Sequence, residues 1–228
     1  DVTVNDNPVV TATATPDIIC LGESITFTGG GADTYAWDLG VTDGVPFFPA
    51  SSGTFTHTVT GTVTATSCTS TATVDVTVND LPIVTATVDP TEICIGESAT
   101  FTGGGADSYT WDLGVTNGVA FTPASAGTVT YTVTGTDATT TCQNTATVDL
   151  TVHALPVVTA TATPDEICLG ESITFTGGGA DSYVWDLGVT DAVPFTPASS
   201  GTFTHTVTGT NATTSCENTA TVDVTVND

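Results

Sequence analysis

The chain has 228 residues and contains 25 aspartates and glutamates but no lysine or arginine, so its formal net charge at pH 7 is −25. Phosphate contacts require cationic side chains, so this composition excludes nucleic acid as a partner and disfavours a bare anionic membrane surface. No apolar run approaches the roughly 20 residues that cross a bilayer, so we expect no direct membrane insertion.

Three near-copies of one 74-residue sequence make up almost the whole chain. The segment ICLGESITFTGGGAD begins at Ile19, returns as ICIGESATFTGGGAD at Ile93, and returns again at Ile167. A fixed period of this kind predicts an array of similar structural units, and we expect this chain to be a segment of a longer array. The predicted parts are the last strand of a preceding repeat at residues 1–6 and three repeats at residues 7–80, 81–154 and 155–228.

Alternation of threonine with apolar residues predicts β-strands along each repeat. In TFTHTVTGTVTAT, from Thr54 to Thr66, Phe55 and Val59 face one side while the threonines between them face the other. This period of two indicates a half-buried strand, and β-branched residues favour an extended backbone. The strands that we expect in the first repeat are residues 9–15, 24–28, 34–39, 45–48, 54–63 and 71–78.

The number of strands and the turns between them favour an all-β fold. Six or seven short strands separated by glycine-rich turns are typical of an immunoglobulin-like β-sandwich. Successive repeats meet at TVNDLP, residues 77–82, and at TVHALP, residues 151–156. Linkers this short that contain proline restrict hinge motion, so we expect a semi-rigid linear array of tandem domains.

The three tryptophan-containing segments carry a resemblance to a known family. TYAWDLGVTDG at Thr34, SYTWDLGVTNG at Ser108 and SYVWDLGVTDA at Ser182 resemble the YxWDFGDG signature of PKD domains, with GVTDG in place of the tight GDG turn. Together with ICLGESITFTGG, they are similar to the Ig-like and PKD-like tandem repeats of giant secreted surface adhesins of Bacteroidetes-type bacteria. The resemblance covers all three repeats and implies a secreted, repetitive stalk or adhesin at the cell surface.

We interpret the aromatic residues and histidines of the strands as structural. Each repeat has one mid-strand tryptophan, which we expect to pack between the sheets rather than to stack on a carbohydrate. These tryptophans are Trp37, Trp111 and Trp185. His57, Tyr131 and His205 share one position in the repeats, where a sandwich often has a corner tyrosine bonded to nearby backbone. No histidine has a second histidine within its own repeat, and neither a catalytic triad nor a metal triplet is visible in the sequence, so we expect no enzyme.

Aspartates in the turns are candidate calcium ligands, because Ca²⁺ prefers oxygen ligands supplied by loops. No D-x-D-x-D-G loop is present, however, and the alternative interpretation is that these side chains cap turns. We therefore predict no firm metal site and no cofactor other than Ca²⁺ at these positions. The candidates are Asp33, Asp38, Asp43, Asp107, Asp112, Asp181, Asp186 and Asp191. Asn211 begins a single N-glycosylation sequon, NAT.

Two cysteines in each repeat indicate disulfides that form outside the cytoplasm. The cysteines are Cys20, Cys68, Cys94, Cys142, Cys168 and Cys216. One pairing joins the two cysteines of each repeat and closes loops of about 48 residues. These within-repeat pairs are Cys20–Cys68, Cys94–Cys142 and Cys168–Cys216.

The strand order of an immunoglobulin sandwich favours a different pairing. Cys20 precedes the expected strand at residues 24–28, and Cys68 follows the one at residues 54–63. These two strands run in the same direction, so the two cysteines lie at opposite poles, whereas a disulfide needs Cα atoms within about 7 Å. End-to-end stacking instead brings the first cysteine of each repeat to the second cysteine of the next. The predicted pairs are Cys20–Cys142 and Cys94–Cys216, with Cys68 and Cys168 pairing with repeats outside this sequence.

The function that we prefer from the sequence is structural: a segment of an extracellular fibre, stalk or adhesin shaft that supplies reach and mechanical strength. Its partners are then neighbouring repeats of the same chain or filament. One alternative is an adhesion module that binds surface glycans, although loops that are nearly identical between repeats suit a spacer better. Another alternative is a surface-layer or matrix protein, for which the acidity is the argument.

Overall fold

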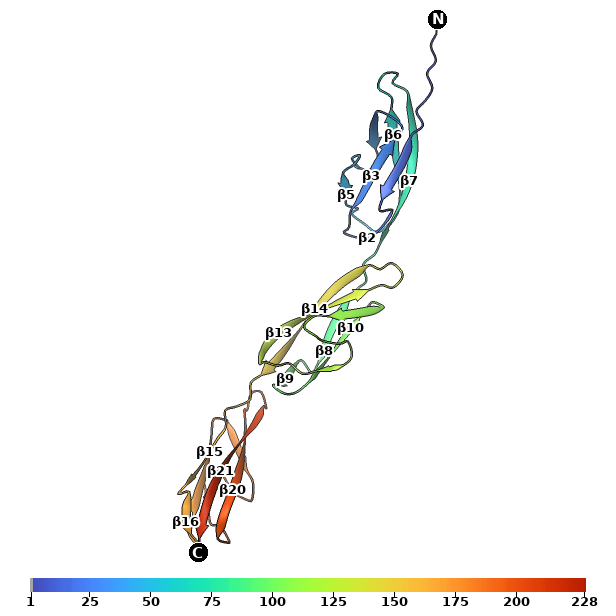
Figure 1. Cartoon of the computed structure of the whole chain (residues 1–228). Coiled ribbons are helices and arrows are strands. Elements are labelled where there is room, and N and C mark those ends of the chain that lie inside the picture. Colours follow the sequence, from blue (N-terminus) through green and yellow to red (C-terminus); the bar gives the residue numbers. More distant parts are fainter. Residues whose placement is uncertain (1) are drawn as a thin grey trace. The chain divides into compact units, whose positions relative to one another are not determined.

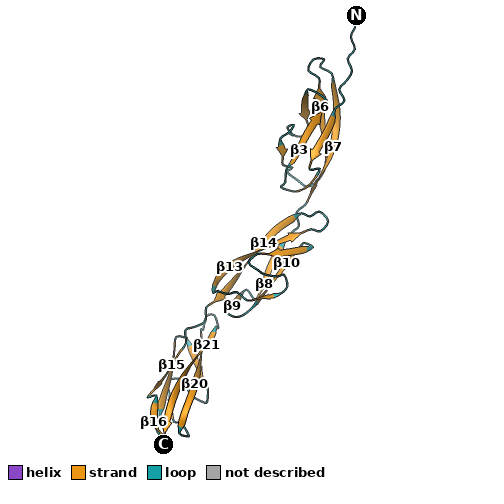
Figure 2. Cartoon of the chain, viewed as in Figure 1, coloured by secondary structure: helices purple, strands orange, loops and turns teal. Residues whose placement is uncertain are grey.

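The chain forms an all-β fold. The computed structural model describes residues 2–228, and within them every regular element is a β-strand (Figure 2). No helix in this part of the chain is long and apolar enough to cross a bilayer. The strands form two sheets for each repeat, so the expected fold of tandem immunoglobulin-like β-sandwiches is confirmed.

The first repeat contains seven strands, drawn in blue to cyan in Figure 1. They are β1 (Thr11–Thr15), β2 (Ile18–Cys20), β3 (Ile25–Gly30), β4 (Thr34–Trp37), β5 (Pro46–Phe47), β6 (Gly53–Thr62) and β7 (Thr69–Asn79). One sheet has the order β1-β3-β5, and the other has the order β2-β7-β6-β4. All neighbouring strands are antiparallel except β2, which runs parallel to β7.

The second and third repeats show the same arrangement of seven strands. The second repeat consists of β8 (Thr85–Asp89), β9 (Glu92–Cys94), β10 (Ala99–Gly104), β11 (Ser108–Trp111), β12 (Ala120–Phe121), β13 (Gly127–Thr136) and β14 (Gln143–His153). The third consists of β15 (Thr159–Thr163), β16 (Glu166–Cys168), β17 (Ile173–Gly178), β18 (Ser182–Trp185), β19 (Pro194–Phe195), β20 (Gly201–Thr210) and β21 (Glu217–Asn227).

The core of each sandwich is made by the apolar residues of the alternating pattern. In the first repeat Ile25, Phe27 and Val59 have no exposed surface, whereas Thr56 on β6 is exposed. The Phe27 ring lies 5.3 Å from the Trp37 ring between their centroids. Burial of each large apolar side chain stabilises the fold by about 1.5–3 kcal/mol, so the period of two directs which face of each strand turns inward.

Two segments differ from the strands expected from the sequence. β2 was not expected, because three residues are too few to show alternation; it forms through its pairing with the end of β7, where Cys20 lies beside Asn79. Residues 1–6 were expected to form the last strand of a preceding repeat. Asp1 lies outside the described residues, and residues 2–6 form no strand. The same sequence at the end of β7 is a strand because β6 pairs with it.

The chain divides into two compact units. The first consists of Asp1–Ala86, Gly103–Trp111 and Thr132–Ala146, and the second of Thr87–Thr102, Asp112–Tyr131 and Thr147–Asp228. Each unit holds one complete outer repeat and part of the middle repeat. Each unit also contains one of the two joints at which consecutive repeats meet.

Candidate functional site

Two disulfides link consecutive repeats, one at each joint. In the first unit Cys20 is bonded to Cys142, and in the second unit Cys94 is bonded to Cys216. The Cα atoms are 5.6 Å apart in both bonds, and each bond spans 122 residues of sequence. These are the two pairs that end-to-end stacking predicts. Repetition of one geometry at both joints makes the joint the candidate functional site.

The within-repeat pairs considered from the sequence are absent from the described residues: Cys20–Cys68, Cys94–Cys142 and Cys168–Cys216. In the first repeat β7 explains why. Cys68 precedes the first residue of this strand, and Cys20 lies beside Asn79, its last residue. The 11 residues of β7 extend roughly 35 Å at about 3.3 Å per residue, far beyond the reach of a disulfide.

One half of each joint is the end of a short strand that local hydrogen bonds hold in place. At the first joint the Cys20 backbone N–H donates to Glu23 Oε2 at 2.8 Å, and the Leu21 N–H donates to the Asn79 carbonyl at 2.9 Å. At the second joint the same two bonds are made by Cys94 to Glu97 at 2.8 Å and by Ile95 to His153 at 2.9 Å. The position of this cysteine is therefore determined within its own repeat.

The other half of each joint is a loop that a side chain caps. At the first joint Asp137 Oδ1 accepts the N–H of Thr139 at 2.9 Å, the N–H of Thr140 at 2.8 Å and the Thr140 hydroxyl at 3.0 Å. The hydrogen bonds from Thr140 are the main reason that the pKa of Asp137 lies below its ordinary value. Asn211 caps the equivalent loop at the second joint through the same three groups. Cys142, which ends the capped loop, is 1% exposed.

A side-chain amide near the start of the strand that follows each capped loop bonds to the linker that enters its repeat. Asn144 Nδ2 donates to the Pro82 carbonyl at 3.0 Å, and Asn218 Nδ2 donates to the Pro156 carbonyl at 3.0 Å. Sequence reasoning missed these asparagines and the capping residues. The signal available was that they occur in the second and third repeats and not in the first.

Cys68 and Cys168 are the two unpaired cysteines of the described residues. Cys168 is exposed at the end of β16, yet its N–H makes the same bond to a glutamate, Glu171, at 2.9 Å. Cys68 lies in the uncapped loop of the first repeat, with its Sγ 4.0 Å from the Asn5 carbonyl oxygen. Cys168 therefore stands at the strand-end half of a joint, and Cys68 stands at the loop half. In the described residues neither is bonded to the complementary half.

The corner-tyrosine interpretation of the shared His/Tyr position is wrong for His57 and His205. Both side chains lie between the sheets, 3% exposed, with each ring 4.5 Å from a core phenylalanine ring. The tyrosine that bonds to nearby backbone is Tyr35, whose hydroxyl accepts the Ala32 N–H at 2.8 Å and donates to the Ala32 carbonyl at 2.7 Å. A Cβ at Gly29 would clash with the Tyr35 ring, which explains the glycine.

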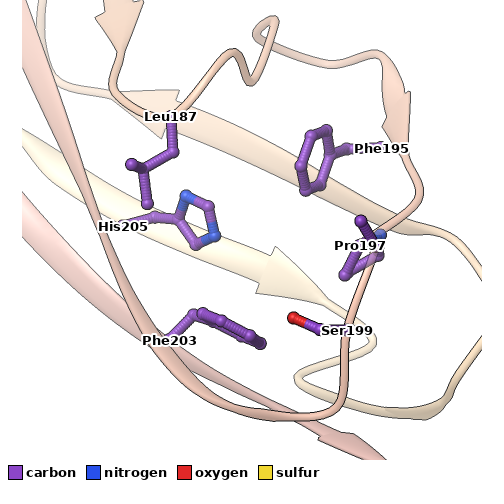
Figure 3. A pocket seen from close by; sticks show the side chains of 7 residues that line it. Leu187, Phe195, Pro197, Ser199, Phe203 and His205 are labelled. Atoms are coloured by element: carbon purple, nitrogen blue, oxygen red, sulfur yellow. The ribbon is translucent and has the colours of Figure 1, made fainter.

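Each buried histidine faces an aspartate of its own repeat. His57 Nδ1 lies 3.4 Å from Asp38 Oδ1, and His205 Nδ1 lies 3.3 Å from Asp186 Oδ1. Beside each histidine is a pocket, of about 200 Å³ in the first repeat and about 150 Å³ in the third. Figure 3 shows the third-repeat pocket, which is lined by Leu187, Phe195, Pro197, Ala198, Ser199, Phe203 and His205.

The pockets bring a serine near a histidine, which sequence reasoning had not anticipated. Ser51 lines the pocket of His57, and Ser199 lines the pocket of His205. Activation of a serine nucleophile needs a hydrogen bond between its hydroxyl and the general base. Among the described residues no such bond joins Ser199 to His205.

Most of the candidate calcium ligands accept hydrogen bonds inside the loops. Asp33 Oδ2 accepts the Thr64 N–H at 2.8 Å, which is the main reason that its pKa is lowered. Asp43 Oδ1 accepts the Trp37 indole N–H at 2.9 Å. Equivalent bonds are made by Asp107, Asp181 and Asp191, whereas Asp38 and Asp186 face the histidines. Within residues 2–228 no group of three or more His, Cys, Asp or Glu is placed to hold a metal ion.

The remaining sequence-predicted residues lie in or beside the sandwiches. Trp111 and Trp185 are 7% exposed, and Trp37 is half-buried. Asn211 is half-buried, and its Oδ1 is the cap of the loop that ends at Cys216.

Comparison with known proteins finds no matching family model and no matching curated protein. Solved structures of tandem domains are similar at low identity. Titin domains I67–I69 are 12% identical with a TM-score of 0.32, covering 98% of this chain and 100% of that chain. The three N-terminal domains of the outer capsid protein Hoc of bacteriophage RB49 are 12% identical with a TM-score of 0.30, covering 97% and 98%. Mouse cadherin-23 EC22–24 is 12% identical with a TM-score of 0.28, covering 97% and 99%.

Proposed function

We propose that this chain is a structural segment of an extracellular fibre, stalk or adhesin shaft, in which disulfides across the joints carry force from repeat to repeat. The observation that supports this most is the recurrence of one joint geometry, with a disulfide between consecutive repeats at both joints. Persistent disulfides are typical of oxidising compartments, which supports an extracellular location. The resemblance to repeats of Bacteroidetes-type surface adhesins agrees with this role, which is mechanical rather than catalytic.

The two disulfides overlap along the sequence, and the overlap shortens the covalent path. A force applied at the two ends passes from Cys20 to Cys142, back along the middle repeat to Cys94, and across to Cys216. The residues on this path number about 80, which span about 280 Å when fully extended, against about 800 Å for all 228 residues. The disulfides therefore prevent most of the extension that unfolding would otherwise release.

Single-molecule stretching tests this proposal. The oxidised chain should reach a contour length of about 280 Å, and the same chain in reductant should reach about 800 Å. The double variant Cys20→Ser, Cys142→Ser should give an intermediate length without reductant. Equal contour lengths with and without reductant would contradict the proposal, because the disulfides would then carry no force.

The same proposal assigns a partner to each unpaired cysteine: Cys168 of one segment pairs with the equivalent of Cys68 in the next. Mixing the variant Cys68→Ser with the variant Cys168→Ser under mild oxidation tests this pairing. A complementary joint should produce the mixed dimer in clear excess over both homodimers. A statistical mixture of the dimers would mean that the two thiols meet without a specific surface.

A further inference from the structure

The pockets beside His57 and His205 have the size and lining of a site for a small aromatic ring. They occupy matching positions in the first and third repeats and measure about 200 and about 150 Å³. An apolar cavity of about 150 Å³ holds a benzene-sized molecule. Besides the histidine, the first-repeat pocket is lined by Leu39, Phe47, Pro49, Ala50, Ser51 and Phe55. The walls are therefore largely aromatic and aliphatic.

A buried histidine supplies a polar atom in each pocket. His205 is 3% exposed; its Nδ1 lies 3.3 Å from Asp186 Oδ1, and both of these atoms are buried without a hydrogen-bond partner. Figure 3 shows the other ring nitrogen, Nε2, pointing toward the space between Phe203 and Pro197. No residue among those described forms a hydrogen bond with this nitrogen. A ligand that donates to this nitrogen gains a hydrogen bond as well as contact with the walls.

The aspartate determines which kind of hydrogen bond the histidine offers. In the neutral ring one nitrogen carries the proton and the other accepts. The Asp186 carboxylate beside Nδ1 favours the proton on that nitrogen, so Nε2 is left as an acceptor. The ligand must therefore donate a hydrogen bond. The same carboxylate and the net charge of −25 disfavour anionic ligands such as aromatic acids.

The middle repeat has a phenol at the position of the histidine. There Tyr131 takes the place of the histidine, and its ring lies 4.4 Å from Phe101 and 5.9 Å from Phe121, where the His57 ring lies 4.5 and 5.8 Å from the equivalent phenylalanines. A tyrosine side chain is longer than a histidine and ends in a hydroxyl. The middle repeat thus carries a phenol of its own in this part of the sandwich, and Val129 replaces the phenylalanine of the outer repeats.

From these observations we propose that the first and third repeats each bind a neutral phenol group, with its ring against Phe47 or Phe195 and its hydroxyl donating to His57 or His205. The phenol is either a free small molecule or the side chain of a tyrosine on another protein. The proposal stands apart from the mechanical function, because it concerns the sandwich and not the joints.

The test follows the imidazole C–H resonances of the full oxidised chain by NMR at pH 8, where phenol is still protonated. Phenol should shift the resonances of His57 and His205 saturably and leave His153 unchanged. Anisole, which cannot donate, should bind about fivefold more weakly because one hydrogen bond is lost. N-acetyl-tyrosinamide, with N-acetyl-phenylalaninamide as its control, distinguishes a tyrosine side chain from a free phenol.

Two double variants exchange the residues of the outer and middle repeats. Phe55→Val with His57→Tyr should remove the site of the first repeat, so that one responding imidazole remains. Val129→Phe with Tyr131→His should add a third responding imidazole in the middle repeat. Each residue pair already occurs in one of these sandwiches, so the fold is expected to persist, and near-UV circular dichroism checks it.

Absence of saturation at His57 and His205 up to 10 mM phenol would overturn the proposal. Equal binding of anisole and phenol would also overturn it, because the pocket would then be apolar contact alone. A folded Val129→Phe, Tyr131→His variant without a third response would contradict the assignment of the histidine and phenylalanine as the binding residues. If that variant does not fold, the titration of the wild-type chain and of the first-repeat variant still decides whether the proposal holds.

Discussion

The loop that ends at Cys142 and the loop that ends at Cys68 occupy the same place in two repeats, yet only the first is bonded to a neighbouring repeat. Both loops close with the same backbone hydrogen bond, from Asp137 N–H to Cys142 O and from Val63 N–H to Cys68 O, each at 3.0 Å. In the loop that ends at Cys142, the Asp137 carboxylate also caps the turn. In the loop that ends at Cys68, Val63 stands at that position, and its side chain has no hydrogen-bonding atom.

The strands that follow the two loops also differ in one side chain at the joint. Asn144 bonds to the Pro82 carbonyl in the linker, and Ser70 stands at its place in the first repeat. The backbone of the loop therefore does not depend on these side chains. The residues that differ at these two positions help to place the second cysteine of a joint. The joint and the sandwich are therefore specified by separate residues.

Removing a joint disulfide should give the largest loss in the free energy of unfolding. For the Cys20→Ser, Cys142→Ser variant, the chain-entropy model gives a loss of about 4–5 kcal/mol for a closed loop longer than 100 residues. Guanidinium unfolding of the oxidised protein measures it. The single variant Cys68→Ser is the matched control and should change the midpoint very little. Equal losses in both variants would show that the disulfide does not distinguish the two loops.

Removing the amide bond to the linker should have an intermediate effect. Asn144→Ala leaves the Pro82 carbonyl without its donor and should cost about 1 kcal/mol, whereas Ser70→Ala in the first repeat should cost almost nothing. The rate at which a thiol reduces Cys20–Cys142 reports the effect, with Cys94–Cys216 in the same molecule as the internal reference. An unchanged ratio of the two reduction rates would show that Asn144 does not stabilise the joint.

Acid should weaken the loop of Cys142 selectively. Hydrogen bonds from Thr140 hold the pKa of Asp137 below its ordinary value of 3.8, so their stabilisation is complete above pH 3.8 and is lost as the pH falls through the lowered folded-state pKa. Asn211 caps the equivalent loop and does not titrate in this range. The rates at which a phosphine reduces the two disulfides are measured between pH 2 and 5. As the pH falls, reduction of Cys20–Cys142 should become faster relative to reduction of Cys94–Cys216.

The variant Asp137→Asn is the control for the acid effect. It copies the cap of the third repeat, so the ratio of the two reduction rates should become independent of pH. A ratio that still changes with pH in this variant would assign the effect to other carboxylates.

Restoring the missing cap in the first repeat should have the smallest effect. Val63→Asn copies Asn211 and should stabilise the loop of Cys68 by about 0.5 kcal/mol, because it adds hydrogen bonds at an exposed turn. Amide hydrogen exchange at Ala65 and Thr66 should slow, while Val63→Ala should leave it unchanged. Faster exchange in Val63→Asn would mean that this loop differs from the other two in its backbone as well.

Much of the fold could be predicted because its pattern is local. Threonine alternates with residues such as Phe55 and Val59, and a strand with that period exposes one face and buries the other. The pairing of Cys20 with Cys142 also agrees with a prediction from strand direction, since the direction of the strands decides which pole each cysteine reaches. β2 could not be predicted, because its three residues become a strand only beside β7.

The residues of the candidate sites were harder to predict because their roles depend on distant partners. Asp33 is separated from Thr64 by 31 residues, and its carboxylate has a function in the loop only after β4 and β6 have paired. His57 likewise meets Asp38 and the pocket only when the strands that bear them lie in one sandwich. No spacing in the sequence indicates either contact.

The sequence by itself determined the class of fold, the three repeats, the excess of negative charge and the number of cysteines, because each of these depends on residue types and on their local order. The tertiary structure alone decided which side chains complete the joint at Cys142, and it alone placed His205 in the wall of an apolar pocket. The physical reason is that hydrogen bonds and burial act between atoms that are close in space. Residues 62 positions apart, such as Pro82 and Asn144, become neighbours only after the strands between them have packed.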